Sequence, residues 1–302
     1  MKEKNSILQY INYVIAFLVG GVISVMVVFN TKLGQATTNE VSIFINQIVG
    51  IIALTLIMVI GRRNPTINPK REKSAWWQWF GGLFGLLVLS INYYSVSYAG
   101  TTIAMAASVL GQCLMGVVFD ITGWMGMERQ KISKRRIISL VISIVGILVM
   151  LFWPSTSMST KVVLFGSLGI IAGILTMIQM VYNSSFSEKK GAFFSARQNV
   201  ISGLAGITLF MFLVKPSASI EGLKALSSTP LYVILLGGML ACIVVVSTNT
   251  IIHKLPGAIS SILLSSGQIL MAVLLDALLF GIFTPSLLIG SIIMLIGIFI
   301  GG

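Results

Sequence analysis

The sequence "GQCLMGVVFD" (Gly111–Asp120) occurs in a second version, "GQILMAVLLD" (Gly267–Asp276), 156 residues further along a chain of 302 residues. Six of the ten positions are identical in the two copies. Each copy places a glutamine and an aspartate within a segment that is otherwise almost entirely apolar. Polar side chains in such segments are costly and are often functional. The repetition therefore indicates two related halves, each with one polar motif.

The composition is typical of an integral membrane protein. Hydrophobic residues make up 56% of the chain and charged residues 9%, and the mean hydropathy is +0.99, well outside the range of soluble domains. Apolar runs of about 18 to 25 residues are long enough to cross the bilayer as helices. We predict an all-α fold with ten transmembrane helices, near residues 9–30, 39–60, 76–97, 102–125, 135–153, 162–184, 191–214, 230–251, 258–281 and 284–302.

Other segments match at similar spacings. "FGGLFG" (Phe80–Gly85) resembles "LGGMLA" (Leu236–Ala241) at the same spacing of 156 residues. "GGVISVMVVFNT" (Gly20–Thr31) resembles "GILTMIQMVYNS" (Gly173–Ser184) at a spacing of 153, which pairs Asn30 with Asn183. The spacing changes only where loops are expected. These matches indicate that the whole chain arose by duplication of one repeat.

The duplication predicts two five-helix repeats, residues 1–153 and 162–302, joined by a linker at residues 154–161. Because five is an odd number, the second repeat enters the membrane from the opposite side. Inverted repeats of this kind are typical of secondary transporters, whose substrate site lies near the bilayer midplane between the repeats.

The basic residues predict the orientation. Cytoplasmic loops are enriched in Lys and Arg, and 15 of the 20 basic residues fall in the N-terminal segment and in alternate loops, so both termini are predicted to be cytoplasmic. This topology accounts for the net charge of +12. Nucleic-acid binding is not indicated, because we find no basic domain outside the predicted membrane spans. We expect a multi-pass protein of the bacterial cytoplasmic membrane that contacts lipids, and a homodimer is compatible with the sequence.

The two glutamines of the motif are predicted to lie at the same depth. Gln112 and Gln268 are each about ten residues into their helices, which corresponds to the bilayer centre at about 1.5 Å per residue. Either they line a substrate cavity, or they act as hydrogen-bonding contacts between helices. Other polar residues at internal depth make a cavity the preferred interpretation: Asn30, Asn46, Gln47, Asn92, Tyr93, Ser108, Gln179, Asn183, Gln198, Asn199, Asn249 and Ser265.

The two aspartates leave two roles open. Asp120 and Asp276 either stay hydrated near the headgroups or take up and release protons during transport. Their predicted separation along the membrane normal, on the order of 20 Å, excludes a pair of carboxylates that share one proton, as in an aspartyl protease. The single histidine, His253, is expected in a solvated loop. We find no arrangement of residues that suggests an enzyme, a metal site or a cofactor.

The chain resembles the YdcZ-like branch of the drug/metabolite transporter superfamily over essentially its whole length. The resemblance is carried by "FN" (Phe29–Asn30), "WWQWFGG" (Trp76–Gly82) and "GQCLMGVVFDITGWMG" (Gly111–Gly126), with a second copy from Gly267. It implies a bacterial membrane protein with a central cavity lined by helices one to four and six to nine. The fifth and tenth helices would then be peripheral. The sequence departs from the branch at Gly100, where a proline is expected.

The preferred functional prediction is a secondary transporter that moves a small organic solute by alternating access, either coupled to protons or by exchange. An ATP-driven mechanism is not indicated, because the P-loop pattern is absent from the sequence. The alternative is a membrane subunit that does not transport and instead binds a partner protein or a lipid carrier. Matched polar residues at one depth in both halves favour the transporter.

Overall fold

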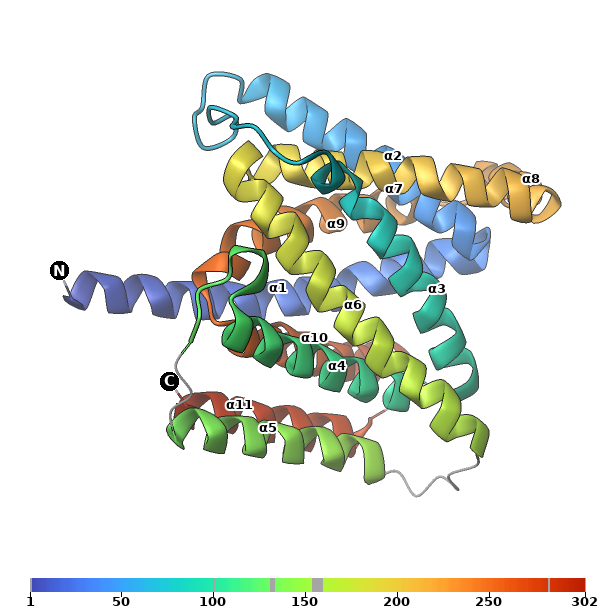
Figure 1. Cartoon of the computed structure of the whole chain (residues 1–302). Coiled ribbons are helices and arrows are strands. Elements are labelled where there is room, and N and C mark those ends of the chain that lie inside the picture. The colour runs from blue at the N-terminus through green and yellow to red at the C-terminus, as the bar shows by residue number, and fades with distance from the viewer. Residues whose placement is uncertain (1, 100, 131–133, 154–159, 282, 302) are drawn as a thin grey trace. The chain divides into compact units, whose positions relative to one another are not determined.

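The computed structural model describes residues 2–99, 101–130, 134–153, 160–281 and 283–301. No β-strand occurs among them, and they form eleven α-helices and four short 3₁₀ turns (Figure 1). The α-helices are α1 (Lys2–Ala36), α2 (Asn39–Ile60), α3 (Gly81–Ala99), α4 (Thr101–Thr122), α5 (Lys134–Phe152), α6 (Thr160–Lys190), α7 (Ala192–Val214), α8 (Pro216–Ala225), α9 (Leu231–Ile251), α10 (Gly257–Phe280) and α11 (Pro285–Gly301). The 3₁₀ turns are η1 (Trp76–Phe80), η2 (Trp124–Gly126), η3 (Leu226–Ser228) and η4 (Ile252–Lys254).

The predicted number of ten transmembrane helices is not confirmed, because the described part of the chain forms eleven α-helices. The additional helix is α8 (Pro216–Ala225), which lies where the sequence suggested a loop. Pro216 occupies its first turn, where the fixed φ of proline suits a helix start and its missing N–H is not needed. A helix of ten residues with charged side chains is too short to span a bilayer. A search for long apolar runs therefore could not detect it.

Seven helices in the described ranges are long and apolar enough to cross a membrane. They are α1, α2, α4, α6, α7, α9 and α10. Two further segments, Ile137–Met150 in α5 and Pro285–Gly297 in α11, are shorter apolar helices. An all-helical fold with this many apolar spans fits the predicted integral membrane class, because helices satisfy their own backbone hydrogen bonds in lipid.

The contacts between helices divide the chain into two compact units. Unit 1 comprises residues 1–21, 87–181 and 251–302, and unit 2 comprises residues 22–86 and 182–250. Each unit takes segments from both predicted repeats, and the boundaries fall within α1, α3 and α6 and at the last residue of α9. The two units are defined by contacts between helices and not by the direction in which the helices cross the membrane. The two inverted repeats and the linker therefore stay a prediction. Most of the predicted linker, residues 154–159, lies outside the described part.

In unit 1, α4 packs on α10 and α5 packs on α11. The second pair is held by small residues. A Cβ at Gly146 would lie 2.6 Å from the carbonyl oxygen of Gly290, and one at Gly297 would lie 2.8 Å from that of Ser139. Such close backbone approach requires small residues where membrane helices cross. Gly146 and Gly297 are thus two residues of one interface, between α5 and α11.

In unit 2, α2 packs along α7. Thr38 caps the start of α2, because its side chain accepts a hydrogen bond from the Val41 N–H at 3.3 Å. Gly191 separates α6 from α7 with a φ of +88°, a conformation that residues with a Cβ rarely adopt. Lys215 and Glu40 form an ion pair at 2.5 Å beside the start of α8.

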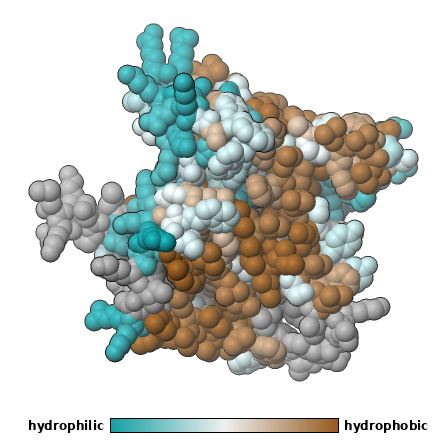
Figure 2. All heavy atoms as spheres, viewed as in Figure 1, coloured by the Kyte–Doolittle hydropathy of each residue, from teal (hydrophilic) through white to brown (hydrophobic). Residues whose placement is uncertain are grey.

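Apolar side chains cover much of the visible surface (Figure 2). On α5 the exposed apolar residues recur at helical spacing and form a continuous stripe: Ile137, Ile138, Val141, Val145, Leu148 and Phe152. A soluble protein rarely exposes so large an apolar area. This stripe fits a face in contact with lipid tails.

Candidate functional site

The motif beginning at Gly111 lies where α4 crosses α6, within unit 1. A Cβ added to Gly111 would collide with the carbonyl oxygen of Ile170, and one added to Gly173 would collide with that of Ser108. The added Cβ at Gly173 would also lie 3.0 Å from the backbone nitrogen of Gln112. The two glycines therefore allow the helices to touch directly beside the glutamine.

The second copy of the motif makes the same contacts. A Cβ added to Gly267 on α10 would collide with the carbonyl oxygen of Phe17, and one added to Gly20 on α1 would collide with that of Leu264. The added Cβ at Gly20 would lie 2.9 Å from the backbone nitrogen of Gln268. These residues are separated from the corresponding residues of the first contact by 153 or 156 residues, the spacings found in the sequence.

The two glutamines of the motif differ in burial within unit 1. Gln112 is 6% exposed, and Gln268 is half-buried. The predicted site residue Ser265 is fully buried, and its hydroxyl has no hydrogen-bond partner. The hydroxyls of Ser266 and Ser95 in the same unit are also buried without a partner. A buried polar atom without a partner is uncommon, so these three hydroxyls are candidates for transient hydrogen bonds to a solute or to water.

Asp120 forms a helix cap. Its Oδ1 accepts a hydrogen bond from the Gly257 N–H at 2.6 Å, and its Oδ2 accepts one from the Ala258 N–H at 3.1 Å. The side chain is 4% exposed. A carboxylate at the start of α10 satisfies two free N–H groups and interacts favourably with the helix dipole. Asp276 is in α10, but its side chain lies outside the described part of the structure.

The first asparagine cluster, in unit 2, joins α1, α2 and α9. Asn46 Nδ2 donates a hydrogen bond to Asn30 Oδ1 at 2.8 Å, and Ser42 Oγ donates one to the Asn30 carbonyl oxygen at 2.8 Å. A Cβ added to Gly237 would collide with Asn30 Oδ1. Asn46 Oδ1 is buried and has no partner. The cluster therefore contains one buried hydrogen-bond acceptor, Asn46 Oδ1, that has no donor among the described residues.

The second asparagine cluster, also in unit 2, joins α6, α7 and the start of α3. Asn183 Nδ2 donates a hydrogen bond to Asn199 Oδ1 at 3.0 Å, and Ser195 Oγ donates one to the Asn183 carbonyl oxygen at 2.8 Å. A Cβ added to Gly81 would collide with Asn183 Oδ1. Each residue of this cluster matches one of the first cluster at a spacing of 153 or 156. The two clusters are therefore equivalent in both sequence and contacts.

Two other predicted residues in unit 2 pack against α7. Gln47 lies over Gly203, where an added Cβ would be 2.7 Å from Gln47 Nε2. Asn249 Nδ2 donates a hydrogen bond to the Ala192 carbonyl oxygen at 3.2 Å, while Asn249 Oδ1 is buried without a partner.

The predicted site residues are thus shared between the two units. Unit 2 contains Asn30, Gln47, Asn183 and Asn249. Unit 1 contains Asn92, Tyr93, Ser108, Gln112, Gln179, Ser265 and Gln268. The side chain of Tyr93 lies outside the described part. That all of these residues line one cavity stays a prediction.

Asn46 and Asn199 were predicted to lie at internal depth, but not as the partners of Asn30 and Asn183. Asn46 is bonded to Asn30, and Asn199 is bonded to Asn183. The sequence contained the signal, because Asn46 and Asn199 are separated by the same 153 residues as Asn30 and Asn183. Gly20, Gly81 and Gly237 each lie where an added Cβ would collide with a neighbouring helix.

A separate polar cavity of about 400 Å³ lies in unit 1. It contains none of the predicted site residues and is lined by Gln9, Asn12, Glu128, Gln130, His253, Lys254, Leu255 and Pro256. His253 was expected to be solvated, but it is half-buried and its Nε2 lies 3.1 Å from the Met125 carbonyl oxygen.

Comparisons with known proteins place the chain in a family. A family model described as "Putative inner membrane exporter, YdcZ" matches residues 11–149 and 164–300. A solved structure titled "Crystal structure of protein" is similar with a TM-score of 0.63 and 16% identity, covering 95% of this chain and 97% of that chain. At this identity the likeness shows a shared fold. Among curated proteins, none matches significantly. Since the family model covers nearly the whole sequence, the chain belongs to the YdcZ-like family of the drug/metabolite transporter superfamily.

Proposed function

We propose that this protein is a secondary transporter that moves a small organic solute across the bacterial cytoplasmic membrane. The description of its family as an inner membrane exporter supports this proposal. So do the apolar spans, which fit a multi-pass protein. Transport would proceed by alternating access, in which two inverted repeats rock around a central site.

The observation that carries the proposal is the duplication of polar contacts. The asparagine pair Asn30–Asn46 has its equivalent in Asn183–Asn199. A transporter with two related access states needs such matched polar groups, whereas a scaffold subunit does not. The two segments that match the family model also lie one in each predicted repeat.

The chemistry of the buried groups suggests the substrate class. The candidate residues are mainly amides and hydroxyls, which can both donate and accept hydrogen bonds. They would suit a polar metabolite or a drug-like compound with several hydrogen-bonding groups. We propose that Gln112 and Gln268 make the main contacts to the solute and that Asp120 or Asp276 takes up the coupling proton. Exchange without a proton is the other mode of the same mechanism.

The test is a thermal-shift screen of the purified protein against metabolites and cationic drugs, followed by transport in proteoliposomes. A ligand that binds only the folded state raises the melting temperature. We expect at least one compound to do so and to enter or leave loaded liposomes at a rate that depends on the protein. Binding without any movement across the membrane would favour a scaffold or carrier-binding subunit.

A further inference from the structure

A basic cluster surrounds a group of aromatic rings in unit 2. The Arg71 guanidinium carbon lies 4.2 Å from the centroid of the Phe194 ring, and that of Arg197 lies 5.4 Å from the same centroid. Lys190 Nζ lies 5.7 Å from the ring centroid of Trp79, which in turn is 5.7 Å from that of Phe194. The two guanidinium carbons are therefore within about 10 Å of each other.

Specific contacts hold this cluster together. The loop before η1 is bound to the end of α6, because the Glu72 N–H donates a hydrogen bond to the Lys189 carbonyl oxygen at 2.9 Å. Pro69 packs over Gly191, where an added Cβ would lie 2.6 Å from the proline ring. Arg71 itself donates a hydrogen bond to Asn68 Oδ1 at 3.3 Å. Three separate segments of unit 2 thus bring the positive charges together.

The charge balance of the cluster depends on whether its cations form ion pairs with the acidic side chains of the described residues. Over the residues that the structure describes, neither Arg71, Lys190 nor Arg197 is within ion-pair distance of an acidic side chain. Cation–π contacts offset only part of the repulsion between cations. Arg197 is half-buried in α7. An anion between the arginines would offset the repulsion between their charges, and a guanidinium fork suits the oxygens of a phosphate.

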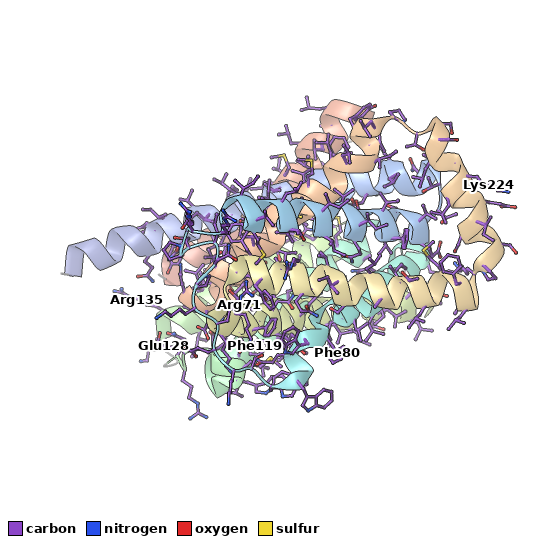
Figure 3. The ribbon with its side chains drawn as sticks, turned by 90° about the horizontal axis from the view of Figure 1, so that it is seen from above. Arg71, Phe80, Phe119, Glu128, Arg135 and Lys224 are labelled. Atoms are coloured by element: carbon purple, nitrogen blue, oxygen red, sulfur yellow. The ribbon has the colours of Figure 1, made fainter. Side chains whose placement is uncertain are left out.

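Neighbouring residues indicate where that phosphate comes from. Trp76 is 77% exposed, Trp77 44% and Phe80 48%, and all three lie in η1, a few residues after Arg71. Exposed tryptophans next to basic residues are typical of the headgroup level of a membrane. Figure 3 shows Arg71 and Lys224 at opposite ends of unit 2, so the cluster lies at one end of its helices. A phospholipid can supply the phosphate at that level.

We propose that Arg71, Lys190 and Arg197 bind the phosphate of an anionic phospholipid headgroup, while the exposed aromatic residues of η1 contact the upper part of its acyl chains. This site is independent of the proposed transport function. Basic pockets between membrane helices are known to recognise anionic headgroups in this way.

The test measures lipid binding to the full-length protein in detergent. Delipidated protein is titrated with phosphatidylglycerol, phosphatidylcholine or inorganic phosphate, and the melting temperature is followed. We expect stabilisation by phosphatidylglycerol alone. The double variant Arg71→Gln, Arg197→Gln should weaken its apparent affinity by on the order of tenfold or more, because two charge-assisted hydrogen-bonding groups are lost. Arg197→Lys, which keeps the charge but loses the fork, should have an intermediate affinity.

Lys224→Gln is the matched control, because it removes an exposed positive charge from the other end of unit 2. Its affinity for phosphatidylglycerol should equal that of the unmodified protein. Equal stabilisation by both lipids, equal affinity in the control and the double variant, or stabilisation by inorganic phosphate without lipid would each overturn the proposal. Melting of the variants without lipid shows whether they are folded.

Discussion

Asp120 on α4 is joined to Gly257 at the first turn of α10 by a hydrogen bond of 2.6 Å from the Gly257 N–H to the aspartate Oδ1. The two helices also approach closely beside this bond, since a Cβ at Gly116 would lie 2.6 Å from the Gly257 carbonyl oxygen. A proton on this carboxylate would weaken its interaction with the start of α10. The cap therefore connects the charge of Asp120 with the position of a helix that carries Gln268.

Substitutions at Asp120 separate its capping role from a role in coupling. Asn caps helices about as well as Asp, whereas Ala does not, so Asp120→Ala should destabilise the protein by about 1 to 2 kcal/mol and Asp120→Asn by less. If Asp120 carries the coupling proton, both variants should lose proton-driven accumulation and keep solute exchange. The measurements are melting temperature and proteoliposome uptake with and without a pH gradient. Normal gradient-driven uptake by Asp120→Asn would restrict this residue to a structural role.

Gly20 and its neighbour Gly21 provide a matched test of helix crossing. A methyl group at Gly20 would collide with the backbone of Leu264, whereas one at Gly21 would have its nearest contact at 3.4 Å, with the flexible side chain of Met271. Gly20→Ala should therefore cost about 1 to 3 kcal/mol through overpacking. Gly21→Ala should change stability by less than about 1 kcal/mol, since Ala also favours the helix. Thermal melting in one detergent compares the two, and similar losses would contradict the packing described at Gly20.

The predicted orientation can be tested at two exposed positions of unit 2. Thr66 follows α2 and Ser217 lies in α8. Cysteine at Ser217 should react with an impermeant thiol reagent in intact cells, and cysteine at Thr66 should react only after the cells are opened. The native residues Cys113 and Cys242 are buried, so their background labelling should be low. The reverse pattern would invert the predicted topology.

The sequence was most informative for properties of a single helix, such as its position and length. The predicted span 39–60 coincides with α2, because hydropathy reports directly on helix length. The spacings of 153 and 156 also identified equivalent positions, as the contacts of Gly111 and Gly267 show.

Relationships between helices were less predictable. Helix rotation is set by packing against neighbouring helices rather than by hydropathy. Consequently the bond between Asn30 and Asn46 and the cap formed by Asp120 could not be derived from depth alone. The division into two packing units was missed for the same reason, since contacts between distant segments define it.

The final prediction concerns Gln112 and Gln268, whose backbones are held by equivalent glycine contacts at Gly173 and Gly20. If both amides bind the solute, each single alanine variant should lose about 1 to 3 kcal/mol of binding free energy, because a buried ligand group is left unpaired. The double variant should lose substantially more, and all three should still fold. Ligand affinity and melting temperature are measured together. Unchanged affinity with a lowered melting temperature would show that the glutamines join helices and that the solute binds elsewhere.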